Sequence, residues 1–363
     1  MKYIGSPNSD HYPKHQVGVL ITNLGTPSAP TKEALKNYLR EFLSDPRVIE
    51  IPRIFWWFIL NVIILNIRPA RSAEAYSTIW TEEGSPLLIH TRNQAKELSQ
   101  ILSSKYGEQI SVDFGMRYGE PSIEYAIESL VSKGVQKLLI LPLYPQYSGP
   151  TTGSTFDAIA KHFVKQRWIP ETRFVSSYHD YPAYIDAICS QIQKYRKKNG
   201  GSDMLIFSYH GEPQSYEEAG DPYFLQCQKT SELLAKKINL ETDKYLTTFQ
   251  SRFGPREWLQ PYTDKTLKEL PNKNVKSVQI ICPGFASDCL ETIEEINVEN
   301  RQYFLDAGGE KYAYIPCLNS ESIHIHALSK LVTDQCQGWL KEDLDNSNSF
   351  RLAENTWSLV KIP

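Results

Sequence analysis

The chain has 363 residues, of which 41% are hydrophobic and 22% are charged, and its formal net charge is −3 at pH 7. This composition is typical of a soluble globular protein, and the length is sufficient for two ordinary domains. Because the chain is slightly acidic and contains no lysine- or arginine-rich block, the sequence argues against a nucleic-acid partner. Residues 1–17 are polar and include two prolines, so we expect no secretory signal there.

The six cysteines form no Cys-x-x-Cys pair. Cys282 lies within an apolar run and Cys317 lies just beyond another, so we expect both thiols to be buried. We therefore expect the cysteines to be reduced thiols, as in a cytoplasmic protein.

Both halves of the sequence alternate apolar strand patterns with amphipathic helix patterns. In the first half, strands are predicted at 17–24, 110–116, 137–141 and 173–177, and helices at 31–44, 71–79, 87–106, 122–132 and 156–165. In the second half, strands are predicted at 204–209, 245–249, 275–282 and 312–315, with a last helix at 322–340. This alternation predicts an α/β protein with two similar Rossmann-like domains, each a four-stranded parallel sheet flanked by helices.

We place an N-terminal α/β domain at 1–180, a C-terminal α/β domain at 181–340, and a polar tail without predicted elements at 341–363. The two halves share residues at their strand ends. Stretches 114–119 and 249–254 both fit Phe-x-x-Arg-aromatic-Gly, and the first strand of each half runs into Gly-x-Pro. We interpret these matches as a duplicated fold, with coincidence as the alternative.

The first half carries an insertion at about residues 45–90, which we call the lip insertion. Its centre, from Ile54 to Ile67, is an apolar run of 14 residues bracketed by Arg53 and Arg68 and interrupted by two asparagines. A membrane span needs about 20 apolar residues, so this run is short for one. Two interpretations follow: a helix of the protein core, or an apolar lip over a ligand cleft that touches a membrane surface.

The predicted strand at 204–209 runs into His210, followed by Gly211, Glu212 and Pro213. In open α/β sheets, ligands bind at the carboxyl ends of the strands, so this imidazole is expected at a ligand-binding edge. Histidine exchanges a proton near neutral pH and binds metals when neutral. The alternative is a hydrogen-bonded histidine in a loop.

A row of carboxylates follows another strand of the second half. A helix is predicted to begin near Ser287 or Asp288, both good N-cap residues. Glu291, Glu295 and Glu299 then lie at i, i+4 and i+8, on one helical face, with no lysine or arginine between Glu291 and Glu299. A solvated acidic face is one interpretation. The other is a row that passes protons or hard cations, with Glu291 nearest His210.

Several stretches together resemble the ferrochelatase family. They are 208–213 (Ser-Tyr-His-Gly-Glu-Pro), 141–148, 151–154 and 284–292, together with 84–86, 116–118 and 254–264, and the resemblance runs from about residue 17 to residue 332. It implies a lyase that inserts ferrous iron into protoporphyrin IX to form protoheme, the last step of heme biosynthesis. It also implies a fold of two similar four-stranded parallel domains with the porphyrin cleft between them.

The resemblance also implies roles for individual residues. The catalytic and metal-binding residues fall on His210 and Glu291, and Glu295 and Glu299 continue the carboxylate row as a proton or metal relay. The implied substrate-binding residues are Met116, Arg117, Tyr118, Ser85 and Trp258, with Arg68 and Arg71 placed to contact the porphyrin propionates. Ferrous iron is then a substrate and no organic cofactor is expected. Certain relatives carry a C-terminal iron–sulfur cluster, but Cys336 is the only cysteine near this end, so no cluster is expected here.

Two alternatives stay open at this point. One is a chelatase for another metal or another tetrapyrrole, such as coproporphyrin. The other is a non-catalytic porphyrin or heme carrier, which needs the cleft but not the carboxylate row. For location, we expect a cytoplasmic protein with peripheral membrane contact through the apolar run from Ile54 to Ile67.

Overall fold

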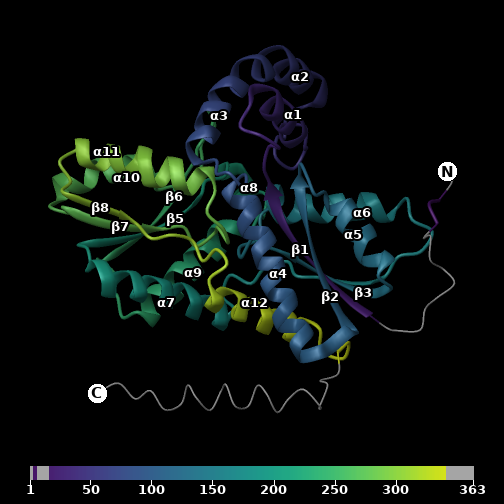
Figure 1. Ribbon diagram of the computed structural model, residues 1–363. Helices are drawn as coiled ribbons and strands as arrows, with labels where there is room; N and C mark the ends of the chain where they lie inside the picture. The colour runs from purple at the N-terminus through teal and green to yellow at the C-terminus, as the bar shows by residue number, and fades with distance from the viewer. Residues whose placement is uncertain (1–2, 6–15, 341–363) are drawn as a thin grey trace, which may run out of the picture.

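Two parallel sheets of four strands each form the framework of the protein (Figure 1). The computed structural model describes residues 3–5 and 16–340, so the predicted tail at 341–363 lies outside the described residues. The first sheet has the strand order β2-β1-β3-β4 and the second has the order β6-β5-β7-β8. Each half therefore orders its own four strands in the same way, which confirms the predicted pair of similar parallel α/β units.

All eight predicted strands are present, with ends shifted by a few residues. The strands are β1 (Gln16–Gly25), β2 (Ile110–Tyr118), β3 (Val135–Pro142), β4 (Glu171–Phe174), β5 (Met204–His210), β6 (Tyr245–Gln250), β7 (Ser277–Ile281) and β8 (Lys311–Tyr314). The α-helices of the first half are α1 (Lys32–Leu43), α2 (Arg53–Phe58), α3 (Leu65–Ile79), α4 (Pro86–Tyr106), α5 (Ile123–Ser132) and α6 (Ser154–Phe163).

The α-helices that follow are α7 (Pro182–Asn199), α8 (Gln214–Glu218), α9 (Tyr223–Lys237), α10 (Thr263–Glu269), α11 (Asn300–Asp306) and α12 (Ser322–Gln335). Three π-helical segments occur at η1 (Ile59–Ile64), η3 (Gly149–Gly153) and η5 (Glu291–Glu299), and two short 3₁₀ helices occur at η2 (Gly107–Gln109) and η4 (Leu270–Lys273). The last helix was predicted to continue to residue 340 but ends at Gln335, because the chain turns after Cys336.

The two halves share one hydrophobic core. Val17 on β1, Leu98 on α4, Leu205 on β5 and Leu328 on α12 belong to the same cluster of buried side chains. Helix α12, which ends the second half, packs against α4 of the first half as well as against α7 (Figure 1). This continuous packing fixes the two sheets relative to each other, as a site built from both halves requires.

The first strand of each half ends at a glycine, and the same steric restriction requires glycine in both places. A Cβ atom on Gly25 would lie 1.8 Å from the carbonyl oxygen of Tyr118, and one on Gly211 would lie 2.6 Å from that of Gln250. In each half, therefore, the second strand approaches the end of the first strand too closely for any side chain. This shared close approach explains why both halves have a glycine at the end of their first strand.

Helices α1, α2 and α3 project beyond the two sheets (Figure 1). Segments α2, η1 and α3 form one continuous helix from Arg53 to Ile79, and by length and composition alone it is the one helix among the described residues that is long and apolar enough to cross a membrane. Trp56, Leu60 and Leu65 on this helix are buried. Eight large apolar side chains are exposed: Ile54, Phe55, Trp57, Phe58, Ile59, Val62, Ile63 and Ile67.

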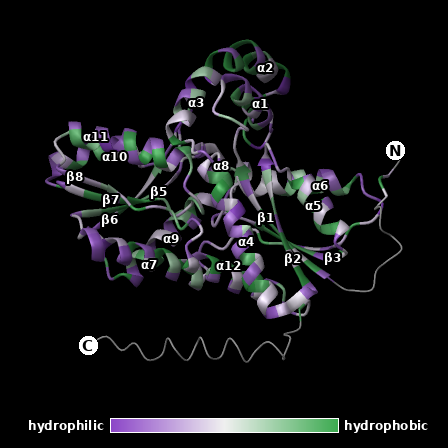
Figure 2. Cartoon of the chain, viewed as in Figure 1, coloured by the Kyte–Doolittle hydropathy of each residue, from purple (hydrophilic) through white to green (hydrophobic). Residues whose placement is uncertain are grey.

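One face of this helix agrees with the core interpretation of the apolar run, and the other face is exposed. One face packs against α1 as core, where the indole N–H of Trp56 donates to the carbonyl oxygen of Leu43 at 2.6 Å. The other face presents hydrophobic residues outward, and the hydropathy colouring shows them on α2 (Figure 2). We call the eight exposed side chains the outer lip face.

Candidate active site

A cleft of about 680 Å³ lies between the lip insertion and the carboxyl ends of the strands. It is lined by the loop after β1, the loops after β5 and β6, the residues after β7, and helices α1 and α3. Eight of the site residues implied by the sequence line it: Arg68, Arg71, Ser85, His210, Trp258, Glu291, Glu295 and Glu299. Residues far apart in the sequence thus meet at the predicted edge of the sheets.

His210 is the last residue of β5, and its side chain is exposed to the cleft. Its Nδ1 atom lies 2.7 Å from the carbonyl oxygen of Gly211. A carbonyl oxygen only accepts hydrogen bonds, so Nδ1 carries the proton in this contact. The Nε2 lone pair is then available for a proton or a metal ion.

Glu291 and His210 are connected through the second sheet. Strand β5, which ends at His210, pairs with β7, and the residues after β7 lead to Glu291 at the start of η5. Gln250 on β6 pairs with His210 in register and donates from Nε2 to the backbone carbonyl oxygen of Glu291 at 3.0 Å. The Ser208 hydroxyl donates to Gln250 Oε1 at 2.8 Å and so fixes the orientation of the amide. The predicted proximity of these strand ends is confirmed, and Gln250 is a residue that sequence reasoning missed.

The carboxylate row lies on a π-helix. The predicted start at Ser287 or Asp288 is wrong, because the π-helix begins at Glu291. The Asp288 carboxylate instead accepts hydrogen bonds from the Tyr314 hydroxyl at 2.5 Å and from the Asn319 amide at 2.6 Å, which ties it to the segment after β8. π-Helical turns are rare and occur frequently at functional sites.

Glu295 is held by the residue that follows Gln250. The Ser251 backbone N–H donates to Glu295 Oε1 at 2.7 Å, and the Ser251 hydroxyl donates to Oε2. Ser251 has φ of 63°, a left-handed conformation that costs a non-glycine residue free energy and that clusters at active sites. Burial, with the charges of Glu291 and Glu299, raises the pKa of Glu295 to about 7, although the bonds from Ser251 lower it.

The row leads from the interior of the cleft towards solvent. Glu291 and Glu295 are half-buried, whereas Glu299 is exposed and accepts a hydrogen bond from the Tyr303 hydroxyl. Glu294 also lines the cleft, and burial raises its pKa, with the charge of Glu299 adding to the shift and Arg71 opposing it. Sequence reasoning missed Glu294, although its position three residues after Glu291 places it near the same helical face.

Two arginines of α3, Arg68 and Arg71, lie opposite this row. They offset part of its negative charge, which no lysine or arginine within residues 291–299 does. Burial lowers the pKa of Arg68, and the charge of Glu291 opposes that shift. The Arg68 guanidinium also lies over the ring of Phe253, 4.9 Å from its centre. Arg68 and Arg71 are thus cleft residues that face both the acidic row and the space for a ligand.

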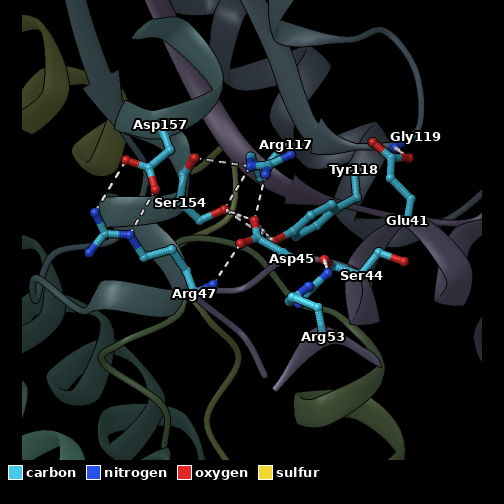
Figure 3. Close-up of polar contacts among 10 residues, drawn as sticks. All are labelled: Glu41, Ser44, Asp45, Arg47, Arg53, Arg117, Tyr118, Gly119, Ser154 and Asp157. Carbon is cyan, nitrogen blue, oxygen red and sulfur yellow. Dashed lines mark hydrogen bonds and ion pairs between the residues drawn. The ribbon is translucent and has the colours of Figure 1, made fainter. Parts of the chain in front are cut away.

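The residues at the end of β2 have a different position. Among the described residues, those that line the cleft do not include Met116, Arg117 or Tyr118. Met116 and Tyr118 are fully buried, and the side chains of Arg117 and Tyr118 turn towards Asp45 (Figure 3). The physical reason is that the buried Asp45 carboxylate requires hydrogen-bond donors, which these two residues supply.

Asp45 forms the base of the lip insertion. Its Oδ2 atom accepts from the Tyr118 hydroxyl at 2.8 Å and from the Ser154 hydroxyl at 2.5 Å (Figure 3). Burial raises the pKa of Asp45. The hydrogen bonds from Ser154, the Arg47 backbone and Tyr118 outweigh this effect, together with the charge of Arg117, and lower the pKa below its usual value. The neighbouring Arg47 forms an ion pair with Asp157 on α6. These contacts attach the lip insertion to the first sheet.

Ser85 and Trp258 both line the cleft. Ser85 is buried at the N-terminus of α4, and Trp258 packs against Gly211, next to His210. Within residues 16–340, the buried indole N–H of Trp258 has no hydrogen-bond partner. A flat aromatic wall beside the imidazole suits a planar macrocycle, because stacked rings contact each other over a large area.

Glu212 is a further cleft residue whose role the sequence did not indicate, although it stands two residues after His210. It is 7% exposed, and the Ser148 hydroxyl donates to its Oε1 atom. Its Oε2 atom has no partner in the part of the chain that the structure describes. Burial, with the charge of Asp221 adding to the shift, raises the pKa of Glu212 well above its usual range. Burial therefore favours the protonated form of this carboxyl group, two residues from His210.

Comparison with known proteins agrees with the sequence motifs. The family model described as Ferrochelatase matches residues 16–336. A protein named Ferrochelatase from Idiomarina loihiensis is 58% identical over 351 residues, with 97% of this chain and 96% of that protein covered. One of the same name from Pseudoalteromonas atlantica is 56% identical over 353 residues, covering 97% and 98%. A solved structure titled "SirB from Bacillus subtilis with Fe3+" has a TM-score of 0.48 and 10% identity, covering 89% and 96%.

Proposed function

We propose that this chain, which belongs to the ferrochelatase family, uses His210 and Glu291 to handle the pyrrole protons and the iron of its reaction. The enzyme inserts ferrous iron into protoporphyrin IX to form protoheme, the terminal step of heme biosynthesis. The non-catalytic carrier is thereby set aside. The observation that carries the residue assignment is the position of the His210 imidazole and the Glu291 carboxylate in one cleft, joined through Gln250.

The reaction removes two protons from pyrrole nitrogens and replaces them with one divalent ion. His210 accepts a pyrrole proton at Nε2, because its Nδ1 proton is committed to the Gly211 carbonyl. Glu291 accepts the proton onward or balances the charge of the incoming iron. Imidazole and carboxylate are ligands that bind ferrous iron without the strong retention of a thiolate site.

The remaining carboxylates supply an exit path. Glu295, with a pKa of about 7, exists in both protonation states at neutral pH and so accepts and releases protons readily. Glu299 is exposed and transfers them to solvent. Ser251 keeps the Glu295 carboxylate oriented towards the cleft through two hydrogen bonds.

Porphyrin binding falls to other residues that line the cleft. Arg68 and Arg71 attract the propionates by charge, and Trp258 and Ser85 contact the macrocycle. The end of β2, from Met116 to Tyr118, supports binding indirectly by holding Asp45 at the base of the lip insertion.

We also propose that the enzyme is cytoplasmic and touches a membrane through the outer lip face. Eight exposed large apolar side chains on one projecting helix support this, since such groups favour the interface between headgroups and acyl chains. The lip insertion also borders the cleft, so membrane contact places the cleft close to a phase in which an apolar porphyrin is soluble.

Substrate choice is tested by competition. Purified enzyme is supplied with protoporphyrin and equal concentrations of ferrous iron and Co²⁺ or Ni²⁺ without oxygen, and the metalloporphyrins are separated by their absorption spectra. The assay is repeated with coproporphyrin. Preferential formation of iron protoporphyrin is expected. Faster turnover with another metal or with coproporphyrin would assign the chain to a related chelation.

A further inference from the structure

We propose that Glu124, Glu128 and His162 form a second site for a divalent first-row transition metal, away from the cleft. One ligand atom from each of the three side chains lies within 4.8 Å of the other two. The two glutamates are on α5 and the histidine is on α6, and these helices lie side by side on one face of the first sheet (Figure 1). The residues that line the cleft, taken over the described part of the chain, include none of the three.

The packing of α5 determines where its two glutamates point. Ile123, Ile127 and Leu130 are buried against the sheet, in the same cluster as Ile159 of α6. Glu124 and Glu128 are four residues apart, so both occupy one exposed strip of the helix. Like charges at this spacing repel each other, and a bound cation would remove that repulsion.

His162 is the observation that points to a ligand. The residue is 4% exposed, and its Nδ1 atom, among residues 3–5 and 16–340, has no hydrogen-bond partner. That atom lies 3.2 Å from Glu124 Oε1, so it points into the cluster. The contact with Glu124 is within ion-pair distance but is not a hydrogen bond, so this buried nitrogen is incompletely paired, and coordination of a metal ion would satisfy it.

The other ring nitrogen of His162 has a neighbour that can orient the ring. Its Nε2 atom lies 3.3 Å from Nε2 of the Gln166 side-chain amide. In the structure the amide nitrogen faces the ring and donates to Nε2. A half-turn of the Gln166 amide would bring its oxygen to the ring, so that Nε2–H donates to Gln166 and the Nδ1 lone pair is free for a metal ion. Metal-binding histidines are generally oriented by such a hydrogen bond from the nitrogen that does not bind the metal.

The donor set selects the class of ion. One neutral imidazole and two carboxylates balance a charge of +2, and imidazole favours Fe²⁺, Co²⁺ or Zn²⁺ over Mg²⁺ and Ca²⁺. Ligand atoms about 2.1 Å from one ion lie within about 4.2 Å of one another, so the cluster must close slightly. Rotation of the exposed glutamate side chains would bring the ligand atoms closer together. This rotation would break the weak contact of 3.9 Å between Lys165 Nζ and Glu124 Oε1.

Glu128→Gln is the sharpest test. Among the described residues Glu128 has no hydrogen bond or ion pair, so the substitution removes a metal ligand and leaves the contact between His162 and Glu124 intact. Glu232→Gln, the same change at an exposed position of α9, is the matched control. Full-length protein without porphyrin is titrated with CoCl₂ by equilibrium dialysis, and visible absorption reports coordination of cobalt.

Wild type and Glu232→Gln should bind one more equivalent of Co²⁺ than Glu128→Gln, or bind it at least about tenfold more tightly. All three proteins should metallate protoporphyrin at the same rate. Crystals soaked in CoCl₂ should show an anomalous peak beside His162 Nδ1. Equal Co²⁺ binding by wild type and Glu128→Gln, or an anomalous peak confined to the cleft, would overturn the proposal.

Discussion

The Gln250 side chain donates a hydrogen bond of 3.0 Å to the backbone carbonyl oxygen of Glu291. Gln250 is also the register partner of His210 on the neighbouring strand. One amide therefore fixes the first residue of the π-helix relative to the strand that carries the imidazole. This arrangement sets the distance between the two groups to which we assign the chemistry.

Replacing Gln250 with leucine should lower kcat by about tenfold or more while the KM for protoporphyrin changes little, because the amide positions Glu291 and does not line the cleft. The variant should also lose about 1–3 kcal/mol of unfolding free energy, since a buried carbonyl loses its donor. Steady-state kinetics and urea denaturation measure the two effects. A parallel rise in KM with unchanged kcat would contradict a positioning role.

Glu291→Gln should reduce kcat by at least about a hundredfold, the scale of a lost acid–base group. Glu295→Gln should cost less, because water substitutes for a relay carboxylate more easily than for the group at the reacting centre. Its deficit should shrink when the concentration of ferrous iron or buffer is raised. Anaerobic stopped-flow measurement of porphyrin fluorescence separates the two. Equal and mild effects of the two substitutions would show that the row is only a solvated acidic face.

The raised pKa of Glu295 predicts a pH-dependent stability. Between pH 4.5, the ordinary value, and about 7, the unfolded chain has lost this proton while the folded protein retains it. The folded state then binds more protons, so this group's contribution to stability falls as pH rises through that window. Relative to Glu295→Gln, wild type should lose roughly 2–3 kcal/mol of unfolding free energy between pH 4.5 and pH 8.

Urea denaturation of wild type and Glu295→Gln across this pH range provides the measurement, and Glu232→Gln serves as a control for loss of a surface carboxylate. A constant difference between wild type and Glu295→Gln across the range would mean that the pKa of Glu295 is not raised.

The two adjacent tryptophans of the lip insertion should behave differently. Trp56 is 4% exposed and Trp57 is 58% exposed. Trp56→Ser should cost about 3–5 kcal/mol of stability, because it leaves a cavity and an unpaired carbonyl at Leu43. Trp57→Ser should leave the melting temperature nearly unchanged and weaken binding to vesicles.

Thermal denaturation and co-sedimentation with phosphatidylglycerol-containing vesicles measure these outcomes. Tyr125→Ser, at an exposed aromatic position on α5 outside the lip insertion, is the matched control for vesicle binding. If Trp57→Ser and Tyr125→Ser bound vesicles as tightly as wild type, membrane contact through the outer lip face would be ruled out.

The sheet framework could be predicted because buried parallel strands leave a strong local signal. The runs that contain β1 and β5 are almost continuously apolar and end at glycine, and the close approach to Tyr118 and Gln250 explains those glycines. His210 and Glu291 could be placed near each other because both follow strands of one parallel sheet. These predictions needed only the order of strands and helices along the chain, and no knowledge of side-chain contacts.

The missing parts depend on contacts that no local pattern encodes. A π-helix and an α-helix use the same residue types, so η5 was predicted as an ordinary helix from Ser287 or Asp288. Gln250 and Ser251 reach their partners across 41 and 44 residues of sequence. The direction of Arg117 was set by the buried carboxylate of Asp45, an acceptor on a distant loop.

The most direct measurement is metallation by His210→Ala beside porphyrin binding by the same protein. The imidazole acts on protons and metal through Nε2 and contributes little to the contact area of the macrocycle, so protoporphyrin should bind with wild-type affinity by fluorescence titration. Insertion of ferrous iron, followed without oxygen by loss of porphyrin fluorescence, should be abolished. Turnover close to that of wild type would contradict the assignment of His210 as the base.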